Sequence, residues 1–207
     1  MIRIKICGHT RVEDMILSYK LGAHAVGFIF NIPSSLRNND KNKAKKFVRS
    51  SPPLVDTVPV TTLDNFYDAI SLGTKTVQII GDIEKIYNLK LEYENVNIVP
   101  VLYINNDYPD FRMLKFYSEF NAIIVDTKNE GKLGGSGLTH NWEISRRISK
   151  ELGNVILAGG LNENNVVEAI TKVEPIGVDV SSGVESYPGI KDPVKVKNFI
   201  RRVVEYA

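Results

Sequence analysis

The stretch VILAGGLNENNVVEAITKVEPIGVDVSSG, residues 155–183, decides the fold. Two short apolar runs, 155–158 and 177–180, lie at its two ends, and each is followed by a loop of small residues. The segment between the runs carries apolar residues at helical spacing: Val166, Ala169, Ile170 and Val173. Apolar runs that are bounded by glycine and separated by an amphipathic helix predict a strand–helix–strand unit with two parallel strands.

The same alternation occurs along the whole chain. Apolar runs predict eight strands, over 2–7, 25–30, 54–60, 76–79, 98–104, 122–126, 155–158 and 177–180. Helical spacing predicts helices over 12–19, 43–49, 63–70, 111–120, 142–152, 166–173 and 193–203, with only a short helix around 83–87. Thr10 and Glu13 predict a capping box before the first helix, and Asp192 predicts the N-cap of the last.

Eight strand–helix units in 207 residues predict an α/β protein, a single-domain (β/α)8 or TIM barrel over residues 1–207. Several predicted strands are almost continuously apolar, as expected when both faces of a parallel sheet are buried. A doubly wound open sheet would alternate in the same way. The number of units, the short loops and the lack of a G-x-G-x-x-G motif after the first strand favour the closed barrel.

Composition argues against several classes of protein. The net charge is only +2 and no face is rich in lysine and arginine, so we expect no nucleic-acid partner. The single cysteine, Cys7, excludes an intrachain disulfide and a cysteine zinc cluster, and His9, His24 and His140 lack the spacing of metal ligands. No apolar run approaches the roughly 20 residues that span a bilayer, and no signal peptide precedes the first strand. We therefore expect a cytoplasmic protein with no membrane partner.

Reactive side chains lie at the carboxyl ends of several predicted strands, where a (β/α)8 barrel carries its chemistry. Cys7 ends the first strand, Gln78 lies near the end of the fourth, Asp126 ends the sixth, and Arg37 lies in the loop after the second. A thiol can act as a base when nearby positive charge favours the thiolate, and an aspartate can act as an acid when burial raises its pKa. The planar fork of Arg37 suits a carboxylate. Each residue also has a plain structural explanation, as a buried cysteine, a turn-capping aspartate or a solvated arginine.

Two neighbouring loops predict a phosphate site. Gly159-Gly160 follow the seventh predicted strand, and Ser181-Ser182-Gly183 follow the eighth. Glycines and small hydroxyl residues let backbone N–H groups approach a phosphate closely, and a helix N-terminus adds partial positive charge. One such pair of glycines would be explained by a tight turn, but two adjacent loops favour phosphate binding.

These residues belong to short motifs that run along nearly the whole chain and resemble the phosphoribosylanthranilate isomerases of tryptophan biosynthesis. Each motif is modest, but their number and order make the resemblance specific. The motifs are KICG at 5–8, GFIF at 27–30, DT at 126–127, GGSG at 134–137, LAGGL at 157–161, VDVSSGVE at 178–185 and GIKD at 189–192.

The resemblance implies an enzyme that catalyses an Amadori rearrangement of N-(5-phosphoribosyl)anthranilate to 1-(2-carboxyphenylamino)-1-deoxyribulose 5-phosphate, without a cofactor or metal. By position, Asp126 would protonate the ring oxygen and Cys7 would remove the proton from C2 of the sugar, while Arg37 would bind the anthranilate carboxylate. The phosphate would lie on Gly159, Gly160, Ser181 and Ser182. Gln78, Gly135 and Asp179 are further candidates for the substrate pocket. Both a monomer and a homodimer are compatible with the family.

The chain departs from the family pattern at several positions. Ile80 replaces the histidine of the family's Gln-Leu-His-Gly, Leu36 replaces the proline of its Ser-Pro-Arg, and Asn141 replaces the aspartate before the tryptophan. Val58-Pro59-Val60 replaces a Gly-Val-Phe pattern. These changes leave the expected acid, base and phosphate loops intact. An isomerase or epimerase of another phosphosugar, or a phosphate-binding barrel without catalysis, remains as an alternative.

Overall fold

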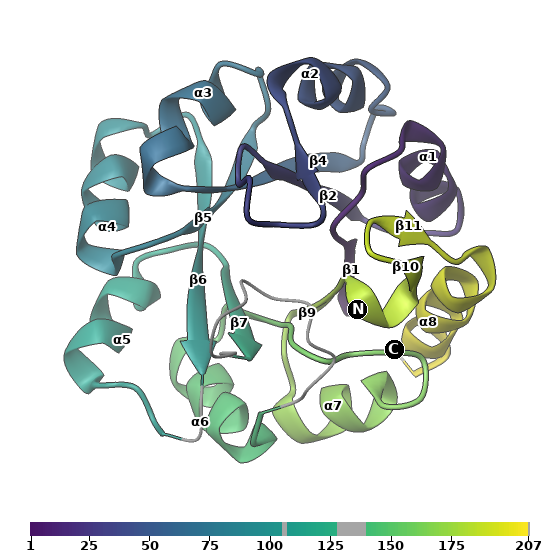
Figure 1. Ribbon diagram of the computed structural model, residues 1–207. Coiled ribbons are helices and arrows are strands. Elements are labelled where there is room, and N and C mark those ends of the chain that lie inside the picture. The colour runs from purple at the N-terminus through teal and green to yellow at the C-terminus, as the bar shows by residue number, and fades with distance from the viewer. Residues whose placement is uncertain (105–106, 128–139, 207) are drawn as a thin grey trace.

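Parallel strands close into a barrel at the centre of the protein, and helices surround it (Figure 1). The computed structural model describes residues 1–104, 107–127 and 140–206. Within these ranges the barrel strands are β1 (Arg3–Ile6), β2 (Ala25–Phe30), β4 (Asp56–Thr62), β5 (Thr76–Ile80), β6 (Asn97–Ile104), β7 (Ile123–Thr127), β8 (Val155–Leu157) and β9 (Gly177–Val180). Strand β1 pairs in parallel with both β2 and β9, which closes the sheet on itself. The prediction of a (β/α)8 barrel rather than an open sheet is thus confirmed.

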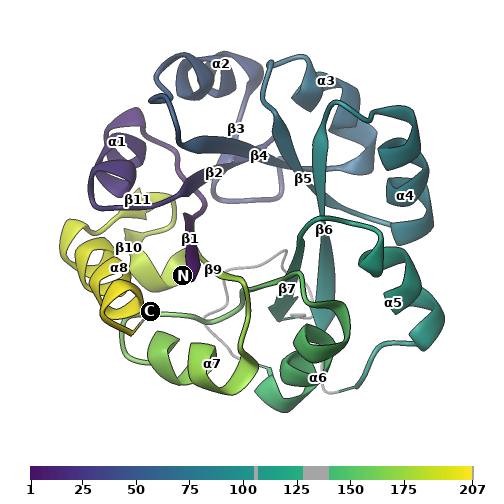
Figure 2. The same ribbon diagram turned by 180° about the vertical axis from the view of Figure 1, so that it is seen from behind.

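The helices form a ring outside the strands in both views (Figures 1 and 2). They are α1 (Val12–Lys20), α2 (Lys41–Arg49), α3 (Phe66–Ile70), α4 (Ile83–Glu92), α5 (Phe111–Ser118), α6 (Trp142–Leu152), α7 (Val166–Val173) and α8 (Pro193–Tyr206). Helix α8 contacts both α7 and α1, so the outer ring is continuous where the chain ends meet. In the part of the chain that is described, no helix is both long and apolar enough to cross a bilayer.

Short polar side chains begin several helices. Asp40, Asp82, Asp110 and Asn141 each accept a hydrogen bond from a backbone N–H in the first turn of the following helix. Asp192 caps α8 in the predicted way, because its Oδ1 accepts from the N–H groups of residues 194 and 195.

Two local predictions are wrong. The capping box of α1 does not form, because the N-cap is Arg11, which makes no side-chain cap. Thr10 instead donates from Oγ1 to the carbonyl oxygen of Gly189, 2.7 Å away, in a distant loop. Helix α4 is also longer than the short segment expected, since it runs through ten residues from Ile83 to Glu92. Asp82 caps it, and Ile83 and Ile86 are buried against the barrel.

The outer faces of the strands and the inner faces of the helices build the main core, which is apolar and continuous around the barrel. The barrel interior is different. A small apolar group, Val101, Ile124 and Ala158, lies there together with three buried polar side chains, Lys5, Gln78 and Asp179. Buried polar groups cost free energy unless they are paired, so their presence inside the barrel marks the region where the structure serves chemistry.

Several very short elements, whose sequences show no periodic pattern of apolar residues, lie at the mouth of the barrel. They are β3 (Asn38–Asn39), β10 (Glu185–Tyr187), β11 (Ile190–Lys191) and the 3-10 turns η1 (Leu63–Asn65) and η2 (Ser182–Val184). Both views place β10 and β11 beside β1 and α8 (Figures 1 and 2). Asn39 fixes the loop after β2, because its Nδ2 donates to the carbonyl oxygens of His9, Ile29 and Arg37. These elements position the charged side chains described next.

Candidate active site

The end of β1 meets two other loops at a tight turn. Cys7 follows β1 directly and is buried, and Gly8 after it has a φ of +79°. A Cβ on Gly8 would lie 2.8 Å from Cδ of Arg37 and would also collide with Oγ of Ser181. Only glycine therefore lets the ends of β1, β2 and β9 approach one another here.

A buried ion pair lies beneath Cys7. Nζ of Lys5 donates to Oδ2 of Asp179 at 2.9 Å, and both side chains are only 8% exposed. Burial alone would lower the pKa of Lys5, but the negative charge of Asp179 holds that pKa above its ordinary value. Lys5 is therefore a permanent ammonium group in the barrel interior.

Burial raises the pKa of the Cys7 thiol above its ordinary value. The positive charge of Lys5 opposes that rise, Asp179 adds to it, and Lys191 opposes it more weakly. Because burial dominates, the pKa of the thiol stays above its ordinary value although the ammonium of Lys5 opposes the rise.

Asp126 lies on β7 and its environment suits a proton donor. Burial raises the pKa of its carboxyl to about 7, although the N–H of Thr127, which donates to Oδ1 at 2.7 Å, works against the rise. Strand pairing places Tyr103 of β6 opposite Asp126, and burial raises the pKa of that phenol as well. A carboxyl with a pKa near 7 is half protonated at neutral pH and can give up its proton to a substrate.

Arg37 is held in place by a second buried network. Its Nε lies 2.9 Å from Oε1 and 3.1 Å from Oε2 of Glu185, and its Nη2 lies 2.6 Å from Oε2. Lys191, whose side chain is 0% exposed, donates to Oε1 of the same carboxylate at 2.8 Å. Burial would raise the pKa of Glu185, but the two cations hold it below its ordinary value. Nη1 of Arg37 makes no hydrogen bond to a described residue, so this nitrogen is available for a ligand.

The two glycine- and serine-containing loops pack against each other. Gly159 and Gly160 both have positive φ, +86° and +67°, and a Cβ on Gly159 would lie 2.6 Å from the backbone nitrogen of Thr127. Gly183 faces the carbonyl oxygen of Leu161 so closely that a side chain has no room. The backbone N–H groups of Gly159 and Gly160 donate to no described residue. Neighbouring backbone amides without a partner in the fold, as in this loop, suit an anion such as phosphate.

One pocket at the carboxyl ends of the strands gathers nearly all of the predicted site residues. Its lining includes Cys7, Arg37, Gln78, Asp126, Gly159, Gly160, Asp179, Ser181 and Ser182. Gly135 lies outside the described residues. Oε1 of Gln78 and Oδ1 of Asp179 are buried and accept no hydrogen bond from a described residue. Ile80, which replaces the expected histidine, also lines this pocket.

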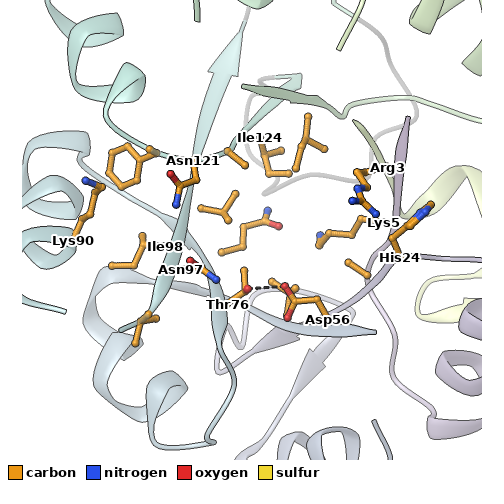
Figure 3. A pocket seen from close by; sticks show the side chains of 18 of the residues that line it. Arg3, Lys5, His24, Asp56, Thr76, Lys90, Asn97, Ile98, Asn121 and Ile124 are labelled. Atoms are coloured by element: carbon orange, nitrogen blue, oxygen red, sulfur yellow. Dashed lines mark hydrogen bonds between the residues drawn. The ribbon is translucent and has the colours of Figure 1, made fainter. Parts of the chain in front are cut away.

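A larger cavity of about 740 Å³ opens at the other end of the barrel, around the amino ends of the strands (Figure 3). Arg3, His24, Asp56 and Asn97 line it, and Thr76 donates to Asp56 at 2.5 Å. Its lining contains neither the thiol of Cys7 nor the carboxyl of Asp126. The smaller pocket is therefore the candidate active site, because it contains the reactive groups and lies at the carboxyl ends of the strands, where such barrels carry their chemistry.

His9 and His140 are buried and make their contacts within the fold. His9 lies between the carbonyl of Gly27 and Oγ of Ser18, and burial lowers its pKa to about 3. His140 contacts Oγ1 of Thr127 at 3.0 Å, and burial lowers its pKa to about 4. Asn141 caps α6. Across residues 1–104, 107–127 and 140–206, no group of three histidine, cysteine or acidic side chains is arranged to hold a metal ion.

Sequence reasoning missed three buried charged residues that support the site through ion pairs: Lys5, Glu185 and Lys191. All three lie within the motifs KICG, VDVSSGVE and GIKD, so their position in those motifs was the available signal. Charged residues are usually exposed, and nothing in the local pattern indicates that these three are buried against one another.

Known proteins are similar to this chain in sequence and in fold. A family model described as N-(5'phosphoribosyl)anthranilate (PRA) isomerase matches residues 4–202. N-(5'-phosphoribosyl)anthranilate isomerase 2 of Methanosarcina mazei is 39% identical over 97% of this chain and 93% of its own. The corresponding isomerase of Geobacter metallireducens is 38% identical over 98% of both chains.

Solved structures agree. The crystal structure of phosphoribosyl anthranilate isomerase from Thermotoga maritima has a TM-score of 0.84 and 33% identity, and the match covers 99% of this chain and 100% of that one. A phosphoribosyl anthranilate isomerase in complex with reduced 1-(o-carboxyphenylamino)-1-deoxyribulose 5-phosphate has a TM-score of 0.81 and 31% identity, with the same coverage. The family model, these relatives and these solved structures all name the same enzyme. The chain belongs to the N-(5'-phosphoribosyl)anthranilate isomerase family, the isomerases of tryptophan biosynthesis.

Proposed function

We propose that this chain carries out the Amadori rearrangement of N-(5-phosphoribosyl)anthranilate with Asp126 as general acid and Cys7 as general base. The observation that carries this proposal is the shared pocket. A carboxyl with a pKa of about 7 and a thiol beside a buried ammonium line the same space as two loops suited to phosphate. Acid and base come from β7 and from the end of β1, so they can act on different parts of one sugar.

Ring opening is the first step. The protonated carboxyl of Asp126 donates to the furanose ring oxygen, the bond from C1 to that oxygen breaks, and the nitrogen lone pair forms a C=N bond. Asp126 becomes a carboxylate, and the sugar becomes an open-chain Schiff base. A donor whose pKa lies close to the working pH is the most effective one for such a transfer.

Proton removal from C2 is the second step. The thiolate of Cys7 takes the C2 proton, and the electrons of the C–H bond form a C=C bond while those of the C=N bond return to nitrogen. The resulting enolamine gives the ketone when its hydroxyl loses a proton and C1 gains one. Over the whole cycle Asp126 regains the proton that it gave up and Cys7 releases the proton that it took, so the protons balance. The substrate's formula is unchanged, so the reaction needs acid–base groups and no redox partner.

Binding at both ends orients the sugar between acid and base. The phosphate lies on the amides and hydroxyls of Gly159, Gly160, Ser181 and Ser182, and the anthranilate carboxylate lies on Nη1 of Arg37. Gln78, Asp179 and Gly135 are further candidates for contacts with the sugar. The free acceptors on Gln78 and Asp179 are suited to sugar hydroxyls. Fixing both ends removes rotational freedom before the chemistry begins.

The proposal also covers the domain organisation, the location, the oligomeric state and the cofactor. Residues 1–207 form one catalytic domain that acts in the cytoplasm, as a monomer or a homodimer, on a small phosphosugar and without a cofactor. One related structure is described as monomers generated from the dimeric isomerase of Thermotoga maritima, so a dimer exists in a relative 30% identical to this chain.

Turnover of freshly generated substrate tests the activity. The anthranilate-type fluorescence of the substrate is followed after the purified protein is added, and we expect it to fall with multiple turnovers. Substrate that carries deuterium at C2 should react more slowly if removal of that proton limits the rate. Persistent fluorescence, with phosphate still bound by the protein, would contradict the proposal and favour another phosphosugar.

A further inference from the structure

We infer that Lys5, held by Asp179, is the ammonium group that stabilises the thiolate of Cys7 during proton removal, and that it is therefore a positioning residue of the reaction. The inference rests on the proposed role of Cys7 as base. It assigns a function to a buried lysine that otherwise has only a structural explanation.

Strand geometry puts the two groups on the same side. Residues two apart in a strand point to the same face, so Lys5 of β1 and Cys7 just beyond its end both face the barrel interior. Figure 3 shows Lys5 reaching from β1 toward the middle of the barrel.

Gly27 on the neighbouring strand shows how close the two groups are. A Cβ placed on Gly27 would lie 2.7 Å from Sγ of Cys7 and 3.1 Å from Nζ of Lys5. The sulfur of Cys7 and the ammonium of Lys5 thus both lie next to Gly27, the one glycine of β2, where the missing side chain leaves room for both.

Lys5 has N–H donors that Asp179 does not use. An ammonium group carries three N–H donors, and Asp179 accepts one of them at 2.9 Å. The carboxylate fixes the ammonium and keeps it charged, and a remaining N–H can serve the thiolate. Burial makes this interaction strong, because few water molecules screen it.

The other charged groups around Cys7 are less suited to the task. Lys191, on β11, is bound to Glu185 at 2.8 Å and to the carbonyl of Ser181 at 3.2 Å. Arg37, in the loop after β2, is also bound to Glu185 through two nitrogens. Of the remaining neighbours, Asp179 on β9 opposes a thiolate by its charge, and Tyr103 on β6 is a neutral phenol.

The test measures the ionisation of Cys7 directly. Cys7 is the only cysteine in the chain, so the ultraviolet titration of each protein, after subtraction of the titration of the same protein carrying Cys7→Ala, removes the signal of the nine tyrosines and reports on the thiolate of Cys7. Lys5→Met removes the charge and keeps most of the volume. It also leaves Asp179 buried without its partner, so the double variant Lys5→Met/Asp179→Asn is made as well. Lys172→Met, which removes an exposed lysine on α7, is the matched control.

We expect the pKa of Cys7 to rise by roughly 1–3 units in Lys5→Met, by less in the double variant, and not at all in Lys172→Met. Turnover should fall mainly through kcat in both Lys5 variants. An unchanged thiol titration in folded Lys5→Met and in the double variant would overturn the inference. A Cys7→Ala variant that keeps its activity would instead refute Cys7 as the base, while the titration still measured the effect of Lys5.

Discussion

The guanidinium of Arg37 holds the carboxylate of Glu185 through Nε and Nη2, although the two residues lie 148 positions apart in the chain. Lys191 binds the same carboxylate from β11. Nε and Nη2 of Arg37 are thus bound to Glu185, which orients Nη1 and leaves Nη1 available for a ligand. The loops after β2 and β9 are joined by this contact at the mouth of the barrel.

Glu185→Gln should weaken both the fold and substrate binding. It leaves Lys191 buried without its anionic partner, and breaking a buried pair in this way costs about 3–5 kcal/mol. We expect the free energy of unfolding, measured with urea, to fall by about that amount, and KM to rise more than kcat falls.

Glu168→Gln is the control for Glu185→Gln, because Glu168 pairs with Lys172 where both side chains are at least half exposed. It should cost less than about 1 kcal/mol and leave KM unchanged. Equal effects of the two substitutions would contradict the buried network.

The rise of activity with pH should stop at a pH of about 7, because the proton of Asp126 is lost there while the thiolate of Cys7, whose pKa is raised, still increases. The histidines do not explain such a break, since the pKa values of His9 and His140 are lowered to about 3 and about 4, and that of His24 is also lowered. The measurement is kcat/KM against pH for the wild type and for Asp126→Asn. The break near pH 7 should be absent from whatever activity the variant keeps, and its persistence there would assign it to another group.

Asp126→Asn should stabilise the protein while it impairs catalysis. The folded pKa of Asp126 is about 7, above the ordinary value, so the stability that the neutral carboxyl provides is present below pH 4 and is lost as pH rises toward 7. Asparagine cannot ionise and avoids that loss. At pH 8 the variant should be more stable by up to about 4 kcal/mol, and at pH 4 the two proteins should be alike. Denaturation at both pH values measures the difference, and a variant that is less stable at pH 8 would contradict the raised pKa.

Gly159→Ala should damage the site, and Gly153→Ala should not. Both glycines have positive φ, so both substitutions cost about 1–2 kcal/mol of backbone strain. A Cβ at 159 also lies 2.6 Å from the nitrogen of Thr127 and 2.9 Å from Oδ1 of Asp126, whereas a Cβ at 153 meets nothing within 4 Å. We expect kcat/KM to fall at least tenfold more in Gly159→Ala than in Gly153→Ala. Similar kinetics in the two variants would show that this turn does not hold the acid in place.

Periodicity predicts the barrel well, because each strand and helix has a long enough apolar pattern of its own. The predicted bounds 25–30, 142–152 and 177–180 agree with β2, α6 and β9. The short elements at the mouth, such as β10 and β11, have two or three residues and carry no period, so only the tertiary structure reveals them. The failed capping box has a similar cause, since Thr10 is used by a contact with Gly189 that is remote in sequence.

The residues at the strand ends could be chosen from the sequence because barrel topology says which positions face the mouth. The structure places Cys7, Asp126, Arg37 and the two loops around one pocket, and their chemical roles remain predictions. Buried charges such as Glu185 and Lys191 could not be predicted, because a charge is buried only when a partner from elsewhere in the chain pairs with it. Their pairing is a property of the assembled loops.

The most direct test of the acid–base pair compares turnover of N-(5-phosphoribosyl)anthranilate by the wild type, Cys7→Ala and Asp126→Asn, followed by loss of substrate fluorescence at saturating substrate. Both variants should remain folded, bind inorganic phosphate as the wild type does, and lose about 10²- to 10⁴-fold in kcat. A folded variant of either kind that keeps kcat within a few-fold of the wild type would contradict the role proposed for that residue.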